Sequence, residues 1–251
     1  MEIKKASENS INGNSKFVVK GTTPTFLNGI RRSAMAHVPV LAIENVSIYE
    51  NDSVMFDEML AQRLGMLPVK TDTKSYKAGD KVKMVLEKEG PCTVYSKDIK
   101  CSDPKIEIAS AKIPITKLKK GQKLKLEMEA IVATGKEHTK WQTGVIAYNE
   151  IPKLVQKGET SKPEDILKKA PKGALELKGK KIAIADPYSF HYSKEKIEEI
   201  SNGALSLDYE NDEFVLTVET NGSLSAIEIL EQSAEALKQK TEEFRKELSK
   251  L

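Results

Sequence analysis

Hydrophobic positions near the N-terminus predict a strand and then a helix. Residues 16–20 are a strand candidate, and Thr23-Pro24 after them is a typical helix start, with Thr as the cap and Pro in the first turn. Apolar residues then recur at spacings of three and four as far as Pro39, which indicates a helix with one apolar face. The apolar positions of this helix are Phe26, Leu27, Ile30, Ala34, Met35 and Val38.

A strand, a second helix and a sheet region follow. Residues 40–50 have the pattern of a strand, and Ser53 is expected to start a helix that stops at Gly65. From about residue 80 to 150 the hydrophobic period becomes two, most clearly over residues 124–132, which predicts an antiparallel sheet. The apolar residues of the second helix are Met55, Phe56, Met59, Leu60 and Leu64.

The rest of the chain contains a turn-rich segment and a long terminal helix. Residues 152–204 are rich in Gly and Pro turns and poor in large apolar residues, which predicts a small separate module or an insertion. After a strand at 213–219, Ser225 and Glu228 fit a capping box. The helix behind them carries a narrow apolar stripe that favours packing against a helix of this chain or another. The stripe contains Ile227, Leu230, Leu237, Phe244 and Leu248, and it is broken at Thr241.

Composition narrows the class of protein. The 251 residues include 40 Lys and Arg against 37 Asp and Glu, and a net charge of +3 argues against an autonomous nucleic-acid binder. The apolar content of 39% is too high for a disordered chain. The longest apolar run, residues 38–43, is far shorter than a membrane span, and the first residues lack the apolar stretch of a signal peptide. We therefore expect a soluble, cytoplasmic protein with no membrane association.

Few residues are candidates for catalysis or metal binding. The three histidines are not spaced as in zinc hydrolases, and no P-loop or nucleophile-elbow motif occurs. Asp57 and Glu58 would serve as half of an acid pair, but first-turn helix electrostatics explains them more simply. Cys92 and Cys101 are expected to be free thiols, because a zinc site needs further ligands and only His138 is a candidate. We expect no intrinsic active site.

The segment 136–142 contains the only Trp of the chain in a basic, polar setting. Such a loop stacks on a base or docks a protein in some cases. It is equally well explained as an ordinary loop whose Trp is anchored at the edge of a domain. The residues alone leave both interpretations open.

Five segments together resemble the D-subunit family of archaeal RNA polymerase, related to the eukaryotic third-largest subunit and the bacterial alpha N-terminal domain. They occur in the family order at residues 28–32, 42–54, 57–68, 135–142 and 214–224. The most specific are D-E-x-x-A-x-R-L-G-x-x-P in the third segment and G-K-E-H-x-K-W in the fourth. The resemblance implies an α+β fold with a discontinuous, alpha-like dimerisation domain of helices on an antiparallel sheet, over residues 1–45 and 205–251. It further implies an inserted mostly-β domain at 46–151 and a ferredoxin-like module at 152–204.

The sequence departs from family members that hold an iron–sulfur cluster. Where those members have Cys-Pro and a close-spaced cysteine run, this chain has Ala170-Pro171 and the cysteine-free segment 186–193. No cysteine follows Cys101, and such clusters need several thiolates. We therefore expect a degenerate module without a cluster, and no cofactor. Cys92 and Cys101 also do not reproduce the zinc-binding cysteines of the eukaryotic counterpart.

The resemblance implies a non-catalytic assembly subunit that forms a heterodimer with subunit L and then recruits subunits N and P and the second-largest subunit, B. DNA would be contacted only indirectly, through the complex. The implied dimer interface contains Phe26, Leu27, Ile30, Ile227, Leu230, Leu237, Phe244 and Leu248. The implied contacts with larger subunits are Arg31, Arg32, Asp57, Glu58, Arg63, Lys136, Glu137, His138 and Trp141.

Three alternatives stay open from the sequence. An enzyme would need a concave site that joins His138, Trp141 and the Asp57-Glu58 pair. An electron carrier would need the cysteines that the turn-rich module lacks. Finally, both apolar stripes would be satisfied inside the chain if it were a self-contained monomer.

Overall fold

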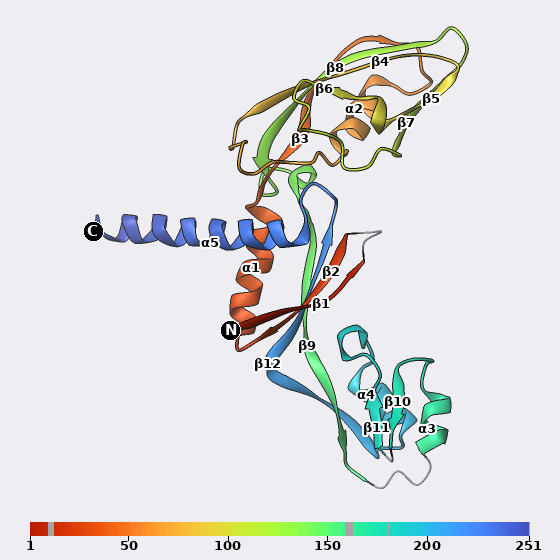
Figure 1. Ribbon diagram of the computed structural model, residues 1–251, viewed down its shortest axis with the longest axis vertical. Coiled ribbons are helices and arrows are strands. Elements are labelled where there is room, and N and C mark those ends of the chain that lie inside the picture. Colours follow the sequence, from red (N-terminus) through yellow and green to blue (C-terminus); the bar gives the residue numbers. More distant parts are fainter. Residues whose placement is uncertain (10–12, 159–162, 180, 251) are drawn as a thin grey trace. The chain divides into compact units, whose positions relative to one another are not determined.

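The structure is a computed structural model that describes residues 1–9, 13–158, 163–179 and 181–250 (Figure 1). It is an α+β protein with five α-helices and several sheets among these residues. The chain divides into two compact units. Unit 1 comprises residues 1–8, 15–24 and 147–217, and unit 2 comprises residues 9–14, 25–146 and 218–251. The three-part division expected from the sequence does not coincide with these units and stays a prediction.

Unit 1 contains most of a four-stranded sheet in the order β1-β2-β12-β9. Its core includes Val18, Ile151 and Val215, one from each of three neighbouring strands. Phe214 is fully buried and meets Tyr148 edge-to-face, with ring centroids 6.2 Å apart. The strands predicted at 16–20 and 213–219 are confirmed as parts of β2 and β12. The strand bounds are β1 Glu2–Asn9, β2 Asn14–Lys20, β9 Gly144–Gln156 and β12 Leu205–Thr220.

The turn-rich segment of unit 1 forms a small structure between β9 and β12. Its strands β10 (Leu175–Lys178) and β11 (Lys181–Ile184) pair antiparallel, and its helices are α3 (Pro163–Lys169) and α4 (Lys194–Ile200) (Figure 1). Although the sequence suggested few large apolar residues, the segment forms a hydrophobic core together with the start of β12. The buried members of that core are Ile166, Ala170, Ala174, Leu175, Ile184, Ile197, Ile200, Leu205 and Leu207.

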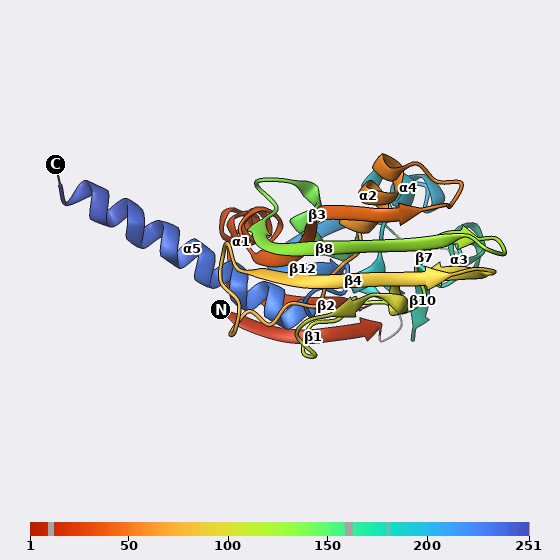
Figure 2. The same cartoon turned by 90° about the horizontal axis from the view of Figure 1, so that it is seen from above.

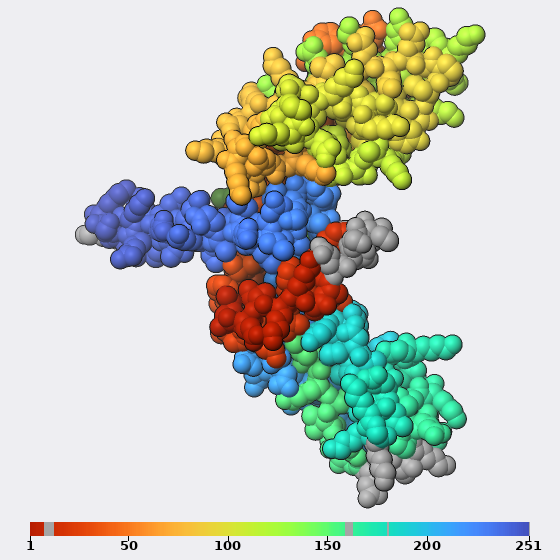
Figure 3. Space-filling view, in the orientation of Figure 1, coloured from red at the N-terminus to blue at the C-terminus, as the bar shows by residue number. Residues whose placement is uncertain are grey.

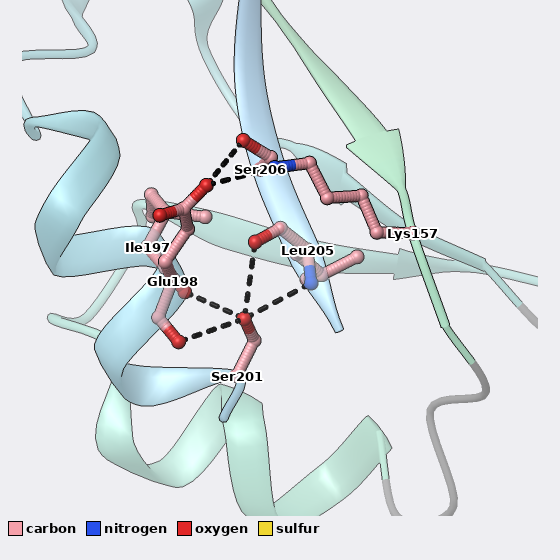
Figure 4. Close-up of polar contacts among 6 residues, drawn as sticks. All are labelled: Lys157, Ile197, Glu198, Ser201, Leu205 and Ser206. Atoms are coloured by element: carbon pink, nitrogen blue, oxygen red, sulfur yellow. Dashed lines mark hydrogen bonds and ion pairs between the residues drawn. The ribbon is translucent and has the colours of Figure 1, made fainter. Parts of the chain in front are cut away.

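Polar contacts fix the end of α4 to the start of β12 (Figure 4). The buried Ser201 hydroxyl donates to the Ile197 carbonyl at 2.7 Å and accepts from the Leu205 amide at 3.0 Å. The Glu198 carboxylate accepts from the Ser206 hydroxyl at 2.7 Å and pairs with Lys157 at 3.1 Å. These contacts add to the backbone hydrogen bonds that the Ile197 and Glu198 carbonyls accept from the amides of Ser201 and Gly203.

Unit 2 contains a second four-stranded sheet in the order β3-β8-β4-β6, and Figure 2 shows its three long strands side by side. In the register of β3 and β8, Leu41 faces Val132 and Ile48 faces Leu126. The alternation predicted over 124–132 is confirmed, because the even-numbered positions are buried. A separate two-stranded sheet joins β5 and β7. The strand bounds are β3 Pro39–Asn51, β4 Lys81–Glu89, β5 Cys92–Tyr95, β6 Lys100–Cys101, β7 Pro114–Leu118 and β8 Lys123–Thr134.

Helix α2 (Asp57–Gly65) starts later than predicted. The side-chain oxygen of Asn51 accepts from the amide of Ser53 at 3.1 Å and from its hydroxyl at 2.7 Å, which holds Ser53 in a turn. The apolar residues predicted on this helix differ in exposure. Leu60 and Leu64 are buried, whereas Phe56 and Met59 are exposed.

Candidate subunit interface

The N-terminal part of α5 (Ala226–Leu248) packs against α1 (Pro24–Ala36) within unit 2 (Figure 1). The buried Ser33 hydroxyl donates to the carbonyl of Ser233 at 2.9 Å. A Cβ built on Gly29 would lie 3.7 Å from Leu237 Cδ2, so Leu237 covers this glycine. Small residues at such a crossing let two helices approach closely. The position of α5 against α1 is therefore fixed by contacts within the chain.

The N-terminus of α5 is closed by the predicted capping box. The Ser225 hydroxyl accepts from the Glu228 amide, and the Glu228 carboxylate accepts from the Ser225 amide at 2.9 Å. This arrangement satisfies two of the amides that a helix start leaves without partners. The helix therefore begins at a defined residue.

The two predicted apolar stripes differ in exposure. Leu27 and Ile30 are buried inside the chain, so their side chains are not available to a partner in this conformation, and the expectation of an exposed stripe is wrong for them. Leu230 and Leu237 are half-buried. The exposed members are Phe26, Ile227, Phe244 and Leu248.

Apart from a contact between Lys240 and His37, the C-terminal part of α5 is bare of other described residues of its unit. Every residue from 238 to 248 is exposed, and Figure 3 shows these turns bare on the face in view. At about 100° per residue, Leu237, Phe244 and Leu248 lie within about 40° of one another around the helix. Phe244 is 66% exposed and Leu248 is 51% exposed. Because helical stability in proteins comes mostly from packing of an apolar face, this row is suited to a partner chain.

The two arginines of α1 have different surroundings. Arg31 is half-buried, and its Nε and Nη2 donate to the Asn28 side-chain oxygen at 3.2 and 2.9 Å. Arg32 is exposed. The structure therefore presents Arg32 more fully to another chain than Arg31.

The loop 135–141 after β8 is anchored by its Trp. Trp141 is 6% exposed, and its indole N–H donates to the Ile131 carbonyl at 3.0 Å. The Lys140 ammonium lies 4.5 Å from the indole centroid and also pairs with Glu44. Trp141 is thus an anchor within unit 2, which agrees with the second of the two interpretations left open by the sequence and does not make its indole an exposed contact. Lys140 lies in the same motif but was not among the expected site residues, and it carries the cation–π contact.

The preceding residues of this loop are exposed. Lys136, Glu137 and His138 face solvent, while His138 Nδ1 accepts from the Lys140 amide at 3.1 Å. A Cβ on Gly135 would collide with the Met35 carbonyl oxygen, so only glycine allows the loop to lie this close to the end of α1. The exposed stretch is therefore held next to α1.

Helix α2 offers another exposed surface, partly different from the predicted one. Asp57 accepts from the Asn51 side-chain amide at 2.7 Å. Arg63 donates to the carbonyls of Ile115 at 3.1 Å and Pro114 at 2.6 Å, so its guanidinium stabilises β7 within the unit. Four apolar residues at or near α2 that were not predicted as site residues are exposed: Val54, Phe56, Met59 and Met66. The i, i+3 spacing of Phe56 and Met59 did not reveal this, because spacing does not say which face is covered.

The described residues do not fit an iron–sulfur cluster. The turn-rich segment contains no cysteine, and Ala170 belongs to its aliphatic core. Across the described part of the chain, no group of three or more His, Cys, Asp or Glu is placed to hold a metal ion. Burial raises the pKa of the Cys101 thiol, which disfavours the thiolate that binds metals. None of the helices in the described ranges is long and apolar enough to cross a membrane.

These features define a class of protein: a subunit that pairs with another chain through a helix whose apolar row is exposed. A family model described as the RNA polymerase Rpb3/Rpb11 dimerisation domain matches residues 16–241, and the chain belongs to this family. The similarity to the D subunit of archaeal RNA polymerase found in the sequence is thereby confirmed.

Several curated relatives are similar over nearly their whole length. DNA-directed RNA polymerase subunit Rpo3 of Natronomonas pharaonis is 37% identical over 92% of this chain and 91% of its own. The Rpo3 subunit of Methanosarcina acetivorans is 37% identical, with 92% of each chain covered. The Rpo3 subunit of Pyrococcus horikoshii is 34% identical over 100% of this chain and 98% of its own.

Proposed function

We propose that this chain is a non-catalytic assembly subunit of a DNA-directed RNA polymerase and that it forms a heterodimer with the small subunit L. The observation that carries the proposal is the C-terminal part of α5, which presents Phe244 and Leu248 on turns that nothing in their unit covers. The membership in a dimerisation-domain family supports the same conclusion.

The partners other than subunit L are proposed from the resemblance to the archaeal D subunit. Subunits N and P and the second-largest subunit, B, would bind surfaces outside the α1–α5 pair. Two exposed groups support this, one on the loop at Glu137 and His138, the other around Phe56, Asp57 and Met59 at the start of α2. DNA would be contacted only through the complex, since the net charge is +3.

We also propose a domain organisation for the chain. Residues 46–151 would be an inserted mostly-β domain, and residues 152–204 would be a ferredoxin-like module that has lost its cluster ligands. The aliphatic core of the module supports this, because Ala170 and its neighbours supply packing and no thiolates. We accordingly propose that the chain functions without a cofactor.

Co-expression with subunit L tests the proposed function. Size-exclusion chromatography with light scattering should give a complex of one copy of each chain. A chain that stays monomeric under all conditions, with L well folded, would contradict the heterodimer. Subsequent addition of subunits N, P and B, one at a time, would show which of them the pair recruits.

A further inference from the structure

Basic residues from three elements of unit 2 lie around the end of α1. Lys240 of α5 lies with its ammonium nitrogen 2.8 Å from His37 Nε2. The backbone amide of Lys136 donates to the carbonyl of Ala36 at 2.9 Å, which places this lysine beside His37. Arg32 lies on α1 about 1.4 turns before His37, and its positive charge acts on the His37 imidazole. We call Arg32, His37, Lys136 and Lys240 the basic cluster.

The described residues form no ion pair with the cationic side chains of the basic cluster. No carboxylate in the described ranges lies within the 4.0 Å ion-pairing distance of Arg32, Lys136 or Lys240. Glu137 is next to Lys136 in the chain, but its carboxylate accepts from the amide and hydroxyl of Thr134. Uncompensated like charges at short range repel one another and attract an anion.

The protonation of His37 depends on its burial and on the positive charges around it. Burial lowers the pKa of His37, and the charges of Lys240, Lys136 and Arg32 lower it further. Because an ammonium group can only donate, the neutral imidazole accepts the Lys240 hydrogen bond at Nε2. Protonation of His37 in the isolated chain would break this contact and add another positive charge.

The position of the basic cluster indicates which kind of molecule supplies the anion. At about 100° per residue, Lys240 lies about 40° from Phe244 and about 60° from Leu237 around α5. The cluster is therefore continuous with the apolar row that we propose binds subunit L. Lys240 also lies at the start of the fully exposed turns, where the partner must approach.

A long polyanion fits this place less well than a single carboxylate. Glu242 and Glu243 follow Lys240 closely, and both are exposed on the same turns. Nucleic-acid binding relies on several basic residues along the backbone path. Here the positive charge is confined to one small area and borders on an apolar row and two carboxylates.

We infer that the basic cluster of Arg32, His37, Lys136 and Lys240 is a receptor for a carboxylate side chain of the dimer partner. This inference rests on the proposed function. It differs from the expectation that assigned Arg32 and Lys136 to the larger subunits. The partner's Asp or Glu accepts hydrogen bonds from Lys240 and from protonated His37, which joins the apolar row of α5 to a specific charged contact.

The inference predicts that pairing is coupled to proton uptake. A carboxylate beside His37 favours the imidazolium, whereas the free chain disfavours it. The complex therefore binds more protons than the separated subunits where His37 titrates, and its affinity rises as the pH falls. His37 is the titrating member, because histidine is the side chain whose charge changes between about pH 5 and 8.

Titration calorimetry of the full-length chain with subunit L tests the inference. For the wild type, Kd should decrease between about pH 8 and pH 5.5, with an enthalpy that depends on the ionisation enthalpy of the buffer. Lys240→Gln keeps most of the apolar stem and should weaken binding about tenfold at low salt and little at high salt. His37→Gln should remove the pH dependence. Lys238→Gln, on the opposite side of α5, is the matched control and should change little.

The possible failures are distinguishable. If wild type and L form a complex but Lys240→Gln and Lys238→Gln have the same affinity, the inference is wrong and the proposed function stands. A wild-type Kd that does not vary with pH would also overturn it. If a DNA oligonucleotide binds the chain through Lys240 while the affinity for L is unchanged, the cluster is a phosphate site. If no complex with L forms, both proposals fail.

Discussion

The C-terminal part of α5 allows a quantitative prediction. Phe244→Ala and Leu248→Ala combined should weaken the complex with subunit L without destabilising the isolated chain. Full burial of a large apolar side chain contributes about 1.5–3 kcal/mol. Phe244 has 66% and Leu248 has 51% of its surface left to bury, so a partner that covers both would gain about 2–3.5 kcal/mol. At about 1.4 kcal/mol per factor of ten, the double variant should raise Kd by roughly 30 to 300 times.

The assay compares two quantities on the same protein. Binding to L is measured by calorimetry, and thermal unfolding of the isolated chain is followed by circular dichroism. Ile229→Ala is the matched control, because Ile229 is on the same helix but fully buried. Truncation of a buried Ile typically costs about 2–5 kcal/mol, which should lower Tm by roughly 4 to 20 °C. The reasoning would be refuted if the Phe244 and Leu248 variant melted as early as the control while its Kd stayed unchanged.

Three further predictions concern other parts of the molecule. The Ser206 hydroxyl and the Lys157 ammonium lower the pKa of Glu198 below its ordinary value of 4.5. The ionised Glu198 carboxylate therefore stabilises the fold above pH 4.5, and this contribution is lost as the pH falls through the lowered pKa. Glu198→Gln should therefore flatten the acid-side loss of stability of unit 1 in denaturant titrations between about pH 3 and 6; an unchanged pH profile would count against this ion pair. Trp141→Phe, which removes the hydrogen bond from the indole to the Ile131 carbonyl, should cost about 0.5–1.5 kcal/mol, whereas His138→Ala should leave Tm nearly unchanged. Protein purified without oxygen should be colourless, and stoichiometric iron and sulfide in it would disprove the expected loss of the cluster.

Much of the fold could be predicted from local pattern. The alternation over residues 124–132 predicted β8 because one face of that strand is buried and the other is in water. The capping box at Ser225 and Glu228 predicted the start of α5 because those side chains satisfy backbone groups of the same helix turn. Local hydrogen bonding and burial on one face leave a direct trace in the sequence.

The start of α2 and the exposure of its face could not be predicted in this way. Ser53 has the chemistry of a cap, but Asn51, two residues earlier, holds it in a turn through its side chain. Phe56 and Met59 have the spacing of a buried face and are nevertheless exposed. Periodicity identifies an apolar face, but it does not show whether the same chain or another one covers that face.

The candidate interface shows the same limit. Phe26 and Leu27 are neighbours on α1, yet Phe26 is exposed and Leu27 is buried. The short loop at Trp141 has a charged, polar composition typical of a surface contact, but its indole is anchored by hydrogen bonding and by Lys140. The basic cluster at His37 combines residues more than 200 positions apart in the chain, so only the packing of α5 on α1 brings them together.

Hydrogen–deuterium exchange of α5, with and without subunit L, tests the dimerisation claim most directly. In the free chain, amides of residues 238–248 should exchange fast, because every residue of these turns is exposed. In the complex the same amides should exchange much more slowly, while exposed amides of the small module around α3 should not change. Protection that appears elsewhere in the chain and leaves residues 238–248 unchanged would contradict the account.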